Sequence, residues 1–341
     1  MNPSVVPTRI STAHALIAAA ATAPSVLNTQ PWSFEIRDHT IELYEDPDRA
    51  TLRRIDPTGR QLTISCGAAL FNMRVTAAHL GRAIDVTLLP DPTKPLLLAT
   101  VSVGARVPVR GQDAALQPAI RRRHTHRRAF SRRSVPGAIV RELAEAARLE
   151  EAALFVMSRR ERAWLLDLIA LSDAVLLDDP GYDRDLARWT DGNPRRHDGI
   201  PPSSFGTTSI SGSPPMRDFA HANSRVLVPR QNYPTDPCVA ILSTTHDTPA
   251  AWLSAGQALQ RVLLLATLRG LSASFLNQPL DTAEIRNELF PYGHPQMIMR
   301  LGYAPPDVAT PRRPLKEIIR RESSQLARGA SVGNGGTGTR A

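Results

Sequence analysis

Short segments in which apolar and polar residues alternate are set between long helical patterns, and this arrangement restricts the folds open to the chain. Residues 32–36 and 41–44 alternate with period two and are separated by Asp38-His39-Thr40, which predicts a β-hairpin. A long helical pattern follows at 56–80 and ends just before Gly81. The chain is therefore expected to combine helices and strands in one globular fold.

The rest of the sequence continues this alternation. Further strands are expected at 86–89, 96–103, 153–157, 239–244 and 297–301, with a short extended piece at 273–276. Further helices are expected at 13–22, 112–122, 135–148, 159–177 and 253–269. Residues 178–237 differ, because they are rich in Pro, Gly, Ser and Thr. Such a long irregular stretch in a compact domain is usually an active-site lid or a disordered insertion.

Positive charge is concentrated in one place. The chain has 341 residues and a formal charge of +9, and seven arginines lie between Arg121 and Arg133. Such a run could bind nucleic acid or a membrane surface, hold the phosphate of a small ligand, or be a solvated face without a partner. Phe130 is the single aromatic residue near the run, which leaves little for base stacking and argues against single-stranded nucleic acid.

Several classes of protein are excluded by what the sequence lacks. There is no apolar run of about 18 residues that could span a bilayer, and residues 12–24 resemble a secretory signal only weakly. Cys66 and Cys238 stand apart in no metal-like spacing, so we expect a reducing, cytoplasmic location and no metal site. His124 and His126 are accompanied by arginines, which repel a cation.

Common enzyme motifs are absent too. The sequence contains no P-loop, no dinucleotide-type G-x-G-x-x-G, no H-E-x-x-H and no G-x-S-x-G. We therefore expect that a bound cofactor carries the function.

Residues 23–32, with the sequence APSVLNTQPW, carry a family resemblance. They resemble the nitroreductase signature A-P-S-x-x-N-x-Q-P-W. Members of that superfamily are FMN-binding α+β homodimers in which this turn packs against the flavin of the neighbouring subunit. The resemblance implies cofactor contacts from Pro24, Ser25, Val26, Asn28 and Gln30. Asn28, which offers both a donor and an acceptor, is expected at the pyrimidine edge of the flavin.

A second resemblance lies within the arginine run. Residues 123–127, with the sequence RHTHR, resemble the family's R-x-S-x-R motif, which grips the FMN phosphate. The paired N–H donors of arginine and the O–H of a hydroxyl both form hydrogen bonds to phosphate oxygens. Thr125 replaces the usual serine and keeps its hydroxyl. The resemblance thus implies phosphate contacts from Arg123, His124, Thr125 and Arg127.

The C-terminal part matches the family in order. Residues 268–275, 299–303 and 310–314 follow the family's sequence of segments, and further basic residues meet the phosphate there. Arg312 and Arg313 are the matching pair, and the resemblance does not say which of them points at the ligand. Residues 276–278 depart from the pattern, because the family often has an acidic residue and a glycine at this point.

The order of the two main motifs is inverted relative to an ordinary nitroreductase, in which the phosphate motif comes first. Each half of this chain has kept the motif that the other half lacks. The resemblance therefore implies two degenerate repeats fused into a pseudo-dimer with one complete flavin site, as in the Acg-type subfamily of actinobacteria. The expected parts are residues 1–110, residues 111–328 with the candidate lid at 178–237, and a disordered tail at 329–341.

The function that the resemblance implies is that of an FMN flavoprotein. It would be an NAD(P)H-dependent oxidoreductase acting on nitroaromatics or quinones, without an obligatory acid or base residue. The alternative is a flavoprotein that sequesters FMN or senses redox state beneath its lid. The implied partners are FMN, NAD(P)H and a small aromatic acceptor, without nucleic acid or membrane. The chain would be a monomer, as a pseudo-dimer, or a higher homo-oligomer.

Overall fold

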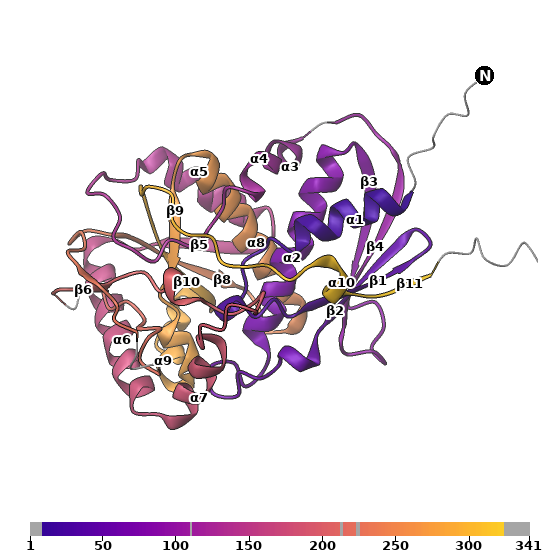
Figure 1. The fold of residues 1–341 in the computed structure, drawn as a ribbon. Helices are drawn as coiled ribbons and strands as arrows, with labels where there is room; N and C mark the ends of the chain where they lie inside the picture. The colour runs from indigo at the N-terminus through magenta and orange to yellow at the C-terminus, as the bar shows by residue number, and fades with distance from the viewer. Residues whose placement is uncertain (1–8, 110, 212–213, 223–225, 324–341) are drawn as a thin grey trace, which may run out of the picture.

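The computed structural model describes residues 9–109, 111–211, 214–222 and 226–323. Two sheets lie on opposite sides of a pair of long helices, and these helices cross near the middle of the molecule (Figure 1). Each sheet has its own apolar core. The expected α+β architecture is confirmed.

The first sheet is built mainly from the N-terminal third of the chain. Its strand order is β11-β1-β2-β4-β3. The predicted hairpin forms as β1 and β2, with Phe34 opposite Leu43 and Ile36 opposite Ile41. These four apolar side chains point into one core against α1 and α2. The bounds are β1 Trp32–Arg37, β2 Thr40–Glu45, β3 Arg82–Leu88, β4 Leu97–Arg106, β11 Ile319–Ser323, α1 Arg9–Ala20 and α2 Arg60–His79.

The second sheet is antiparallel, with strand order β5-β8-β10-β9. Helices α5 and α8 contribute to the core on one face, and α6 packs on the other. The bounds are β5 Ala152–Val156, β8 Cys238–Thr244, β9 Ser272–Phe275, β10 His294–Gly302, α5 Gly137–Arg148, α6 Arg159–Leu177 and α8 Pro249–Leu268.

Helices α2 and α8 cross in a reciprocal way. Both have 20 residues, and each carries a glycine seven positions after its first residue, Gly67 in α2 and Gly256 in α8. A Cβ at Gly67 would lie 2.3 Å from the Leu253 carbonyl oxygen, and one at Gly256 would lie 2.0 Å from the Ile64 carbonyl oxygen. Leu253 and Ile64 are themselves equivalent, since each precedes its glycine by three residues. Such reciprocity is the mark of a twofold interface, here within one chain.

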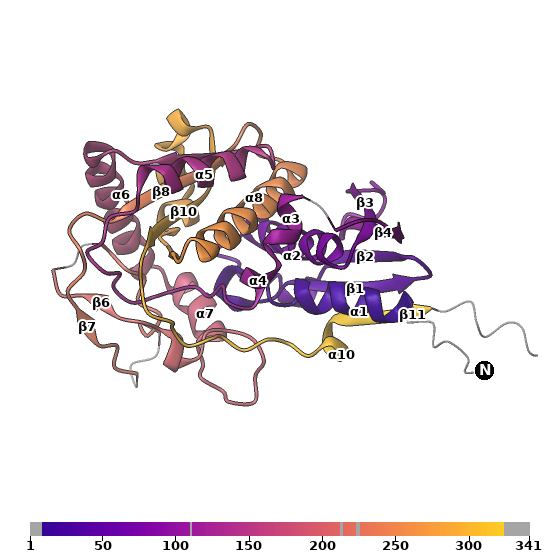
Figure 2. The ribbon, with the colours of Figure 1, turned by 90° about the horizontal axis from the view of Figure 1, so that it is seen from above.

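The C-terminal segment departs from a simple division into halves. After β10 the chain runs back past the turn at 25–30 to α10, Leu315–Ile318, and β11, which pairs in parallel with β1 (Figure 2). The end of the expected second half, 111–328, is thus built into the first sheet. Sequence patterns did not predict β11, because its pairing partner is almost 300 residues away. The expected tail at 329–341 lies outside the described residues.

Residues 178–237 are more structured than expected. They contain a helix, α7 Pro180–Trp189, which Asp179 caps by accepting a hydrogen bond from the Gly181 N–H. Its buried Tyr182, Leu186 and Trp189 share a core cluster with Leu27 and residues 52–55 of the first half. The other regular pieces among the described residues of this segment are a 3₁₀ turn at 202–204 and the short strands β6 Thr208–Ser209 and β7 Arg230–Gln231.

The helix expected at 112–122 is divided into two single turns, α3 Gln112–Ala115 and α4 Gln117–Ile120. Pro118 lies in the first turn of α4, where a missing backbone N–H is tolerated. Because proline has no N–H to donate, α3 cannot continue through this position as one helix. A further short helix, α9 Ala283–Asn287, was not predicted. The 3₁₀ turns are η1 Val26–Asn28, η2 Pro47–Arg49, η3 Pro202–Ser204, η4 Gln278–Asp281 and η5 Phe290–Tyr292.

Candidate functional site

The turn at 25–30 is held in an uncommon backbone conformation. Leu27, Asn28 and Gln30 have φ values of 44°, 56° and 50°, in the left-handed region that side chains disfavour. The Ser25 hydroxyl accepts a hydrogen bond from the Gln30 N–H at 3.0 Å. The Val26 N–H donates to the Ser65 hydroxyl of α2 at 3.2 Å. Strain of about 1–3 kcal/mol per residue persists only where surrounding contacts enforce it, as these do.

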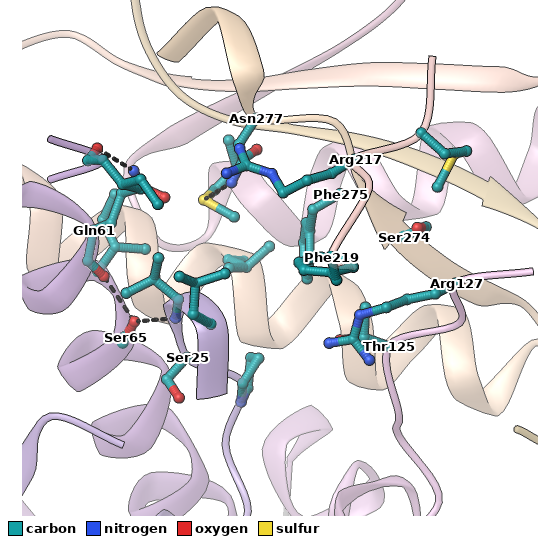
Figure 3. Close-up of a pocket in the computed structure, with 18 residues that line it drawn as sticks. Ser25, Gln61, Ser65, Thr125, Arg127, Arg217, Phe219, Ser274, Phe275 and Asn277 are labelled. Atoms are coloured by element: carbon teal, nitrogen blue, oxygen red, sulfur yellow. Dashed lines mark hydrogen bonds between the residues drawn. The ribbon is translucent and has the colours of Figure 1, made fainter. Parts of the chain in front are cut away.

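This turn forms one wall of a cavity between α2, α8, β9 and the segment 178–237 (Figure 3). The cavity has about 830 Å³ of space free of protein atoms, part of it open to solvent. The predicted site residues Pro24, Ser25, Val26, Thr125 and Arg127 line it. The other lining residues are Leu27, Ile55, Gln61, Ile64, Ser65, Met216, Arg217, Phe219, Leu259, Ser274, Phe275, Asn277 and Met297.

A smaller, polar cavity adjoins the first, and we call the three guanidinium groups there the arginine cluster: Arg123, Arg127 and Arg312. The two cavities share four lining residues, Pro24, Ser25, Thr125 and Arg127. The smaller one is also lined by Asn28, His124, Val308 and Thr310. Residues 24–28, 123–127 and 308–312 are far apart in sequence and meet here.

The arginine cluster carries unbalanced positive charge. No ion pair joins any of its three side chains to a carboxylate in the part of the chain that the structure describes. Burial, together with the charges of the other two arginines, lowers the pKa of Arg123 to about 9. Burial lowers the pKa of Arg312 to about 10, and likewise that of Arg127. All three remain protonated near pH 7.

The cluster also has unused hydrogen-bond donors. The Nε atoms of Arg123 and Arg312 are buried and have no hydrogen-bond partner. Arg123 does donate to the Thr22 carbonyl oxygen at 3.2 Å. A buried cation without a partner is costly, and phosphate oxygens are acceptors that match guanidinium geometry. The cluster therefore suits a doubly charged anion such as a phosphate monoester.

Asn28 lines the smaller cavity beside the arginine cluster. Its amide group donates to the carbonyl oxygens of Gly199 and Pro311, at 2.8 and 3.1 Å. Its Oδ1 accepts from Arg312 at 2.9 Å. Both polar ends of the side chain are thus engaged with neighbouring segments and Arg312, and its contact with the pyrimidine edge of the flavin stays a prediction.

Gln30 and Arg313 line neither cavity. The Gln30 side chain accepts from the Arg313 N–H at 2.8 Å and donates to the His197 carbonyl oxygen at 2.8 Å. The Arg313 guanidinium reaches Asp46 at 3.4 Å and the Glu317 carbonyl oxygen at 2.9 Å. Both residues therefore fasten the returning C-terminal segment, and the structure places Arg312 rather than Arg313 in the cluster.

Part of segment 178–237 forms a wall of the larger cavity, through Met216, Arg217 and Phe219. Arg217 forms a buried ion pair with Asp281 at 2.5 Å, and Asp281 also accepts from Gln61 at 2.8 Å. The Arg127 guanidinium lies 5.4 Å from the Phe219 ring centroid. The backbone carbonyl oxygen of Arg127 accepts a hydrogen bond from the Thr207 N–H at 3.2 Å. This part of the segment is packed onto the cavity through both its polar and its apolar side chains.

Several cavity residues were missed by sequence reasoning. Gln61 and Ser65 lie within the long helical pattern of α2, where nothing distinguishes them from core residues. Met216, Arg217 and Phe219 lie in the irregular segment, and only its composition drew attention to it. Asn277 lies in the stretch at 276–278 that departs from the family pattern, so the departure itself was the available signal.

Membrane-spanning and metal-binding features are absent from residues 9–323, leaving out the gaps given above. No helix there is long and apolar enough to cross a membrane. No group of three or more His, Cys, Asp or Glu side chains there could hold a metal ion.

Comparison with known proteins identifies relatives over nearly the whole chain. No protein-family model matches it. A Mycobacterium tuberculosis protein named as a putative NAD(P)H nitroreductase is 36% identical over 319 residues, which is 90% of this chain and 91% of the relative. The M. tuberculosis putative NAD(P)H nitroreductase acg is 30% identical over 321 residues, or 88% and 92% of the two chains.

Two solved nitroreductase structures are similar to part of the chain. One is the FMN-dependent nitroreductase NfnB from Mycobacterium smegmatis in complex with NADPH, with 18% identity, a TM-score of 0.39, and coverage of 60% of this chain and 97% of that one. Another is a Bacteroides fragilis nitroreductase with bound FMN, with 16% identity, a TM-score of 0.35, and coverage of 64% and 98%. The sequence relatives decide the classification: the chain belongs to the nitroreductase superfamily, among its Acg-type members.

Proposed function

We propose that the chain binds one FMN and uses it as an NAD(P)H-dependent oxidoreductase. The observation that carries this proposal is the arginine cluster, with its unpaired guanidinium groups, at one end of a larger, mainly apolar cavity. FMN has the same division, with a phosphate dianion at one end and a flat ring system at the other. The names of the M. tuberculosis relatives support the same assignment.

In this proposal Arg123, Arg127 and Arg312 hold the phosphate, and the Thr125 hydroxyl lies beside it. The ring system occupies the larger cavity, between Ile64 of α2 and Phe275 of β9. Pro24, Ser25 and Val26 border the ring from the turn at 25–30. Gln30 and Arg313 keep that turn and the C-terminal segment in place without touching the cofactor.

The reciprocal helix crossing supports a single site. Ile64 and Ser65 line the cavity, and their equivalents in α8 are Leu253 and Ser254. Leu253 is fully buried in the core of the first half, among side chains such as Leu16 and Trp32. Ile64 is buried in the core of the second half in the same way, but neither Leu253 nor Ser254 lines the two cavities described above, so the crossing borders them on one side.

Bound FMN would accept hydride from NAD(P)H and pass electrons to a nitroaromatic or quinone. The chain's own contribution is to bind and orient. The arginine cluster neutralises the phosphate, and Met216, Phe219, Phe275 and Met297 give the larger cavity walls that exclude water. No titratable side chain needs to transfer a proton for this chemistry.

A second candidate function rests on how firmly the cavity is covered. The Arg217–Asp281 ion pair is fully enclosed, with side-chain exposures of 10% and 0%, and α7 is anchored in a common core with the first half. A cover fixed in this way would favour a flavoprotein that sequesters FMN or reports redox state and reduces external substrates slowly.

An absorption spectrum of the purified protein in air, repeated after anaerobic addition of NADPH, tests both candidates. Flavin bands that bleach with NADPH would establish a reductase. Bands that persist with NADPH but bleach with dithionite would favour sequestration beneath the cover. The absence of flavin bands after incubation with FMN would overturn FMN binding altogether.

A further inference from the structure

A second large cavity lies on the other side of the segment that carries the arginine cluster. It has about 1410 Å³ of space free of protein atoms, part of it open to solvent. It shares no lining residue with the two cavities described above. Nothing in the proposed flavin chemistry uses it. The lining comes from α5, α6, β5, β8 and β10, from the stretches 130–135 and 233–237, and from Pro214.

Arg300 of β10 lies at the inner wall of this cavity with 1% of its surface exposed. Its guanidinium is held between two rings, 4.1 Å from the Phe130 centroid and 4.9 Å from the Tyr233 centroid. It donates to the Arg128 carbonyl oxygen at 2.6 Å. Burial lowers the pKa of Arg300 to about 10, which still leaves it charged at neutral pH.

The two rings leave hydrogen-bond donors of the Arg300 guanidinium without an acceptor. Aromatic faces interact with the flat faces of a guanidinium, whereas its N–H groups point outward in the guanidinium plane. The Arg300 Nε is buried and has no hydrogen-bond partner, and Arg300 has no ion pair with any carboxylate among the described residues. A buried cation with an unused donor favours an anionic acceptor in the adjoining space.

The rest of the lining fits an anion with an apolar body. Arg132, Arg133 and Arg162 also line the cavity, against a single carboxylate, Asp236, which pairs with Arg162. The Ser131 and Ser134 hydroxyl groups are further candidate donors. The apolar part of the wall consists of Val135, Val140, Val156, Met157 and Leu301.

We propose that this cavity is a second ligand site, distinct from the flavin site, for a small organic anion. The anionic group, a phosphate or a carboxylate, is held by Arg300 and the neighbouring arginines, and a ring-sized apolar body packs against the valines. Tyr233 lines this cavity, and its hydroxyl lies 2.8 Å from the Thr207 carbonyl oxygen and 3.2 Å from that of Arg127. Tyr233 therefore contacts both this cavity and the backbone at Arg127.

The test is calorimetric titration of phenyl phosphate, and separately of benzoate, into protein kept in excess FMN so that the arginine cluster is filled. We expect binding of at least one probe, and the stronger one identifies the preferred anionic group. Arg300→Met should weaken it by roughly ten- to hundredfold, as loss of a charge-assisted hydrogen bond does. Arg300→Lys keeps the positive charge but lacks the planar guanidinium with its several donors. Its affinity for the probe should therefore lie between those of the wild type and Arg300→Met.

A second pair of variants avoids the buried arginine, whose loss could disturb folding. Val140→Trp on α5 fills the cavity without altering any charge and should weaken binding to a similar extent. Ala138→Trp, on the same helix but facing a different groove, is the matched control and should bind the probe like the wild type. Failure of both probes to bind, or binding that Val140→Trp leaves unchanged, would overturn the proposal.

Discussion

Two groups of buried or half-buried arginines lie close to the paired helices α2 and α8, and they differ in their partners. Arg74 of α2 and Arg261 of α8 share Glu150, at 2.5 and 2.7 Å, and Arg261 also reaches Asp113 at 2.7 Å. The arginine cluster has no such carboxylates among the described residues. The clearest difference between the two groups is therefore their charge balance.

The contrast separates charges that hold the fold together from charges kept for a ligand. The first group joins the two halves of the pseudo-dimer, because Arg74 and Arg261 come from different helices and meet on one carboxylate. The second group remains unbalanced until an anion arrives. Removing charge should therefore lower stability in the first group and ligand affinity in the second.

The largest expected effect is on stability. Glu150→Ala leaves Arg74 and Arg261 with only Asp113, and loss of one member of a buried pair typically costs about 3 kcal/mol or more. Urea denaturation should show this decrease in the free energy of unfolding. Glu145→Ala, which removes an exposed partner of Arg148 on α5, is the control and should change it by less than about 0.5 kcal/mol. Equal effects of the two substitutions would mean that Glu150 is not structurally important.

The next effect is on ligand affinity and uses two adjacent arginines. Arg312→Met should weaken FMN binding by about 1.5–3 kcal/mol, the contribution of a hydrogen bond to a charged group. It should change the stability of the FMN-free protein little, because relief of an unbalanced charge offsets the loss of the hydrogen bonds to Asn28 and Thr310. Arg313→Met should leave FMN affinity nearly unchanged but lower the free energy of unfolding by about 1–3 kcal/mol, because Asp46 and the Gln30 carbonyl oxygen lose a donor.

Fluorescence titration with FMN and urea denaturation of the FMN-free proteins measure the two quantities separately. If both variants lose FMN affinity to the same degree, the assignment of Arg312 to the ligand and Arg313 to the fold is wrong.

Local patterns predicted the parts of the molecule that local interactions determine. The β1–β2 hairpin and the helices α2 and α8 follow from periodicity within a few residues, and the structure confirms them. The family resemblance predicted the superfamily and the fused repeat from short motifs alone. These motifs also pointed to residues 24–28 and 123–127, which the fold brings together around adjoining cavities.

Contacts between distant segments could not be predicted in this way. The choice between Arg312 and Arg313 depends on which one faces Asp46, on a strand end more than 250 residues earlier. The role of Asn28 depends on the carbonyl groups of Gly199 and Pro311. Helix α7 was missed because its apolar side chains are few, and it is stabilised by a core shared with the first half.

The smallest predicted effect on stability comes from two neighbouring carboxylates, one paired with arginines and one without an ion pair among the described residues. Glu45 and Asp46 are neighbours at the end of β2. Asp46 accepts from Arg320 at 2.7 Å and lies 3.4 Å from Arg313. Glu45 has only a hydrogen bond from Thr63, at 3.3 Å, and no ion pair within the described part of the chain. Burial, with the nearby charge of Asp56, raises the pKa of Glu45 to about 7.

Because the pKa of Glu45 is higher in the folded than in the unfolded protein, the folded state favours the protonated carboxyl. The contribution of Glu45 to stability is therefore fully present below its ordinary pKa of 4.5 and is lost as the pH rises through about 7. Glu45→Gln, which stays neutral, should raise the free energy of unfolding at pH 8 by about 1–2 kcal/mol and leave it nearly unchanged at pH 4.5. Asp46→Asn should instead lower it at pH 8, because Arg313 and Arg320 lose their partner. Urea denaturation of the three proteins at both pH values measures these changes, and a Glu45→Gln variant less stable than the wild type at pH 8 would show that this carboxylate is paired after all.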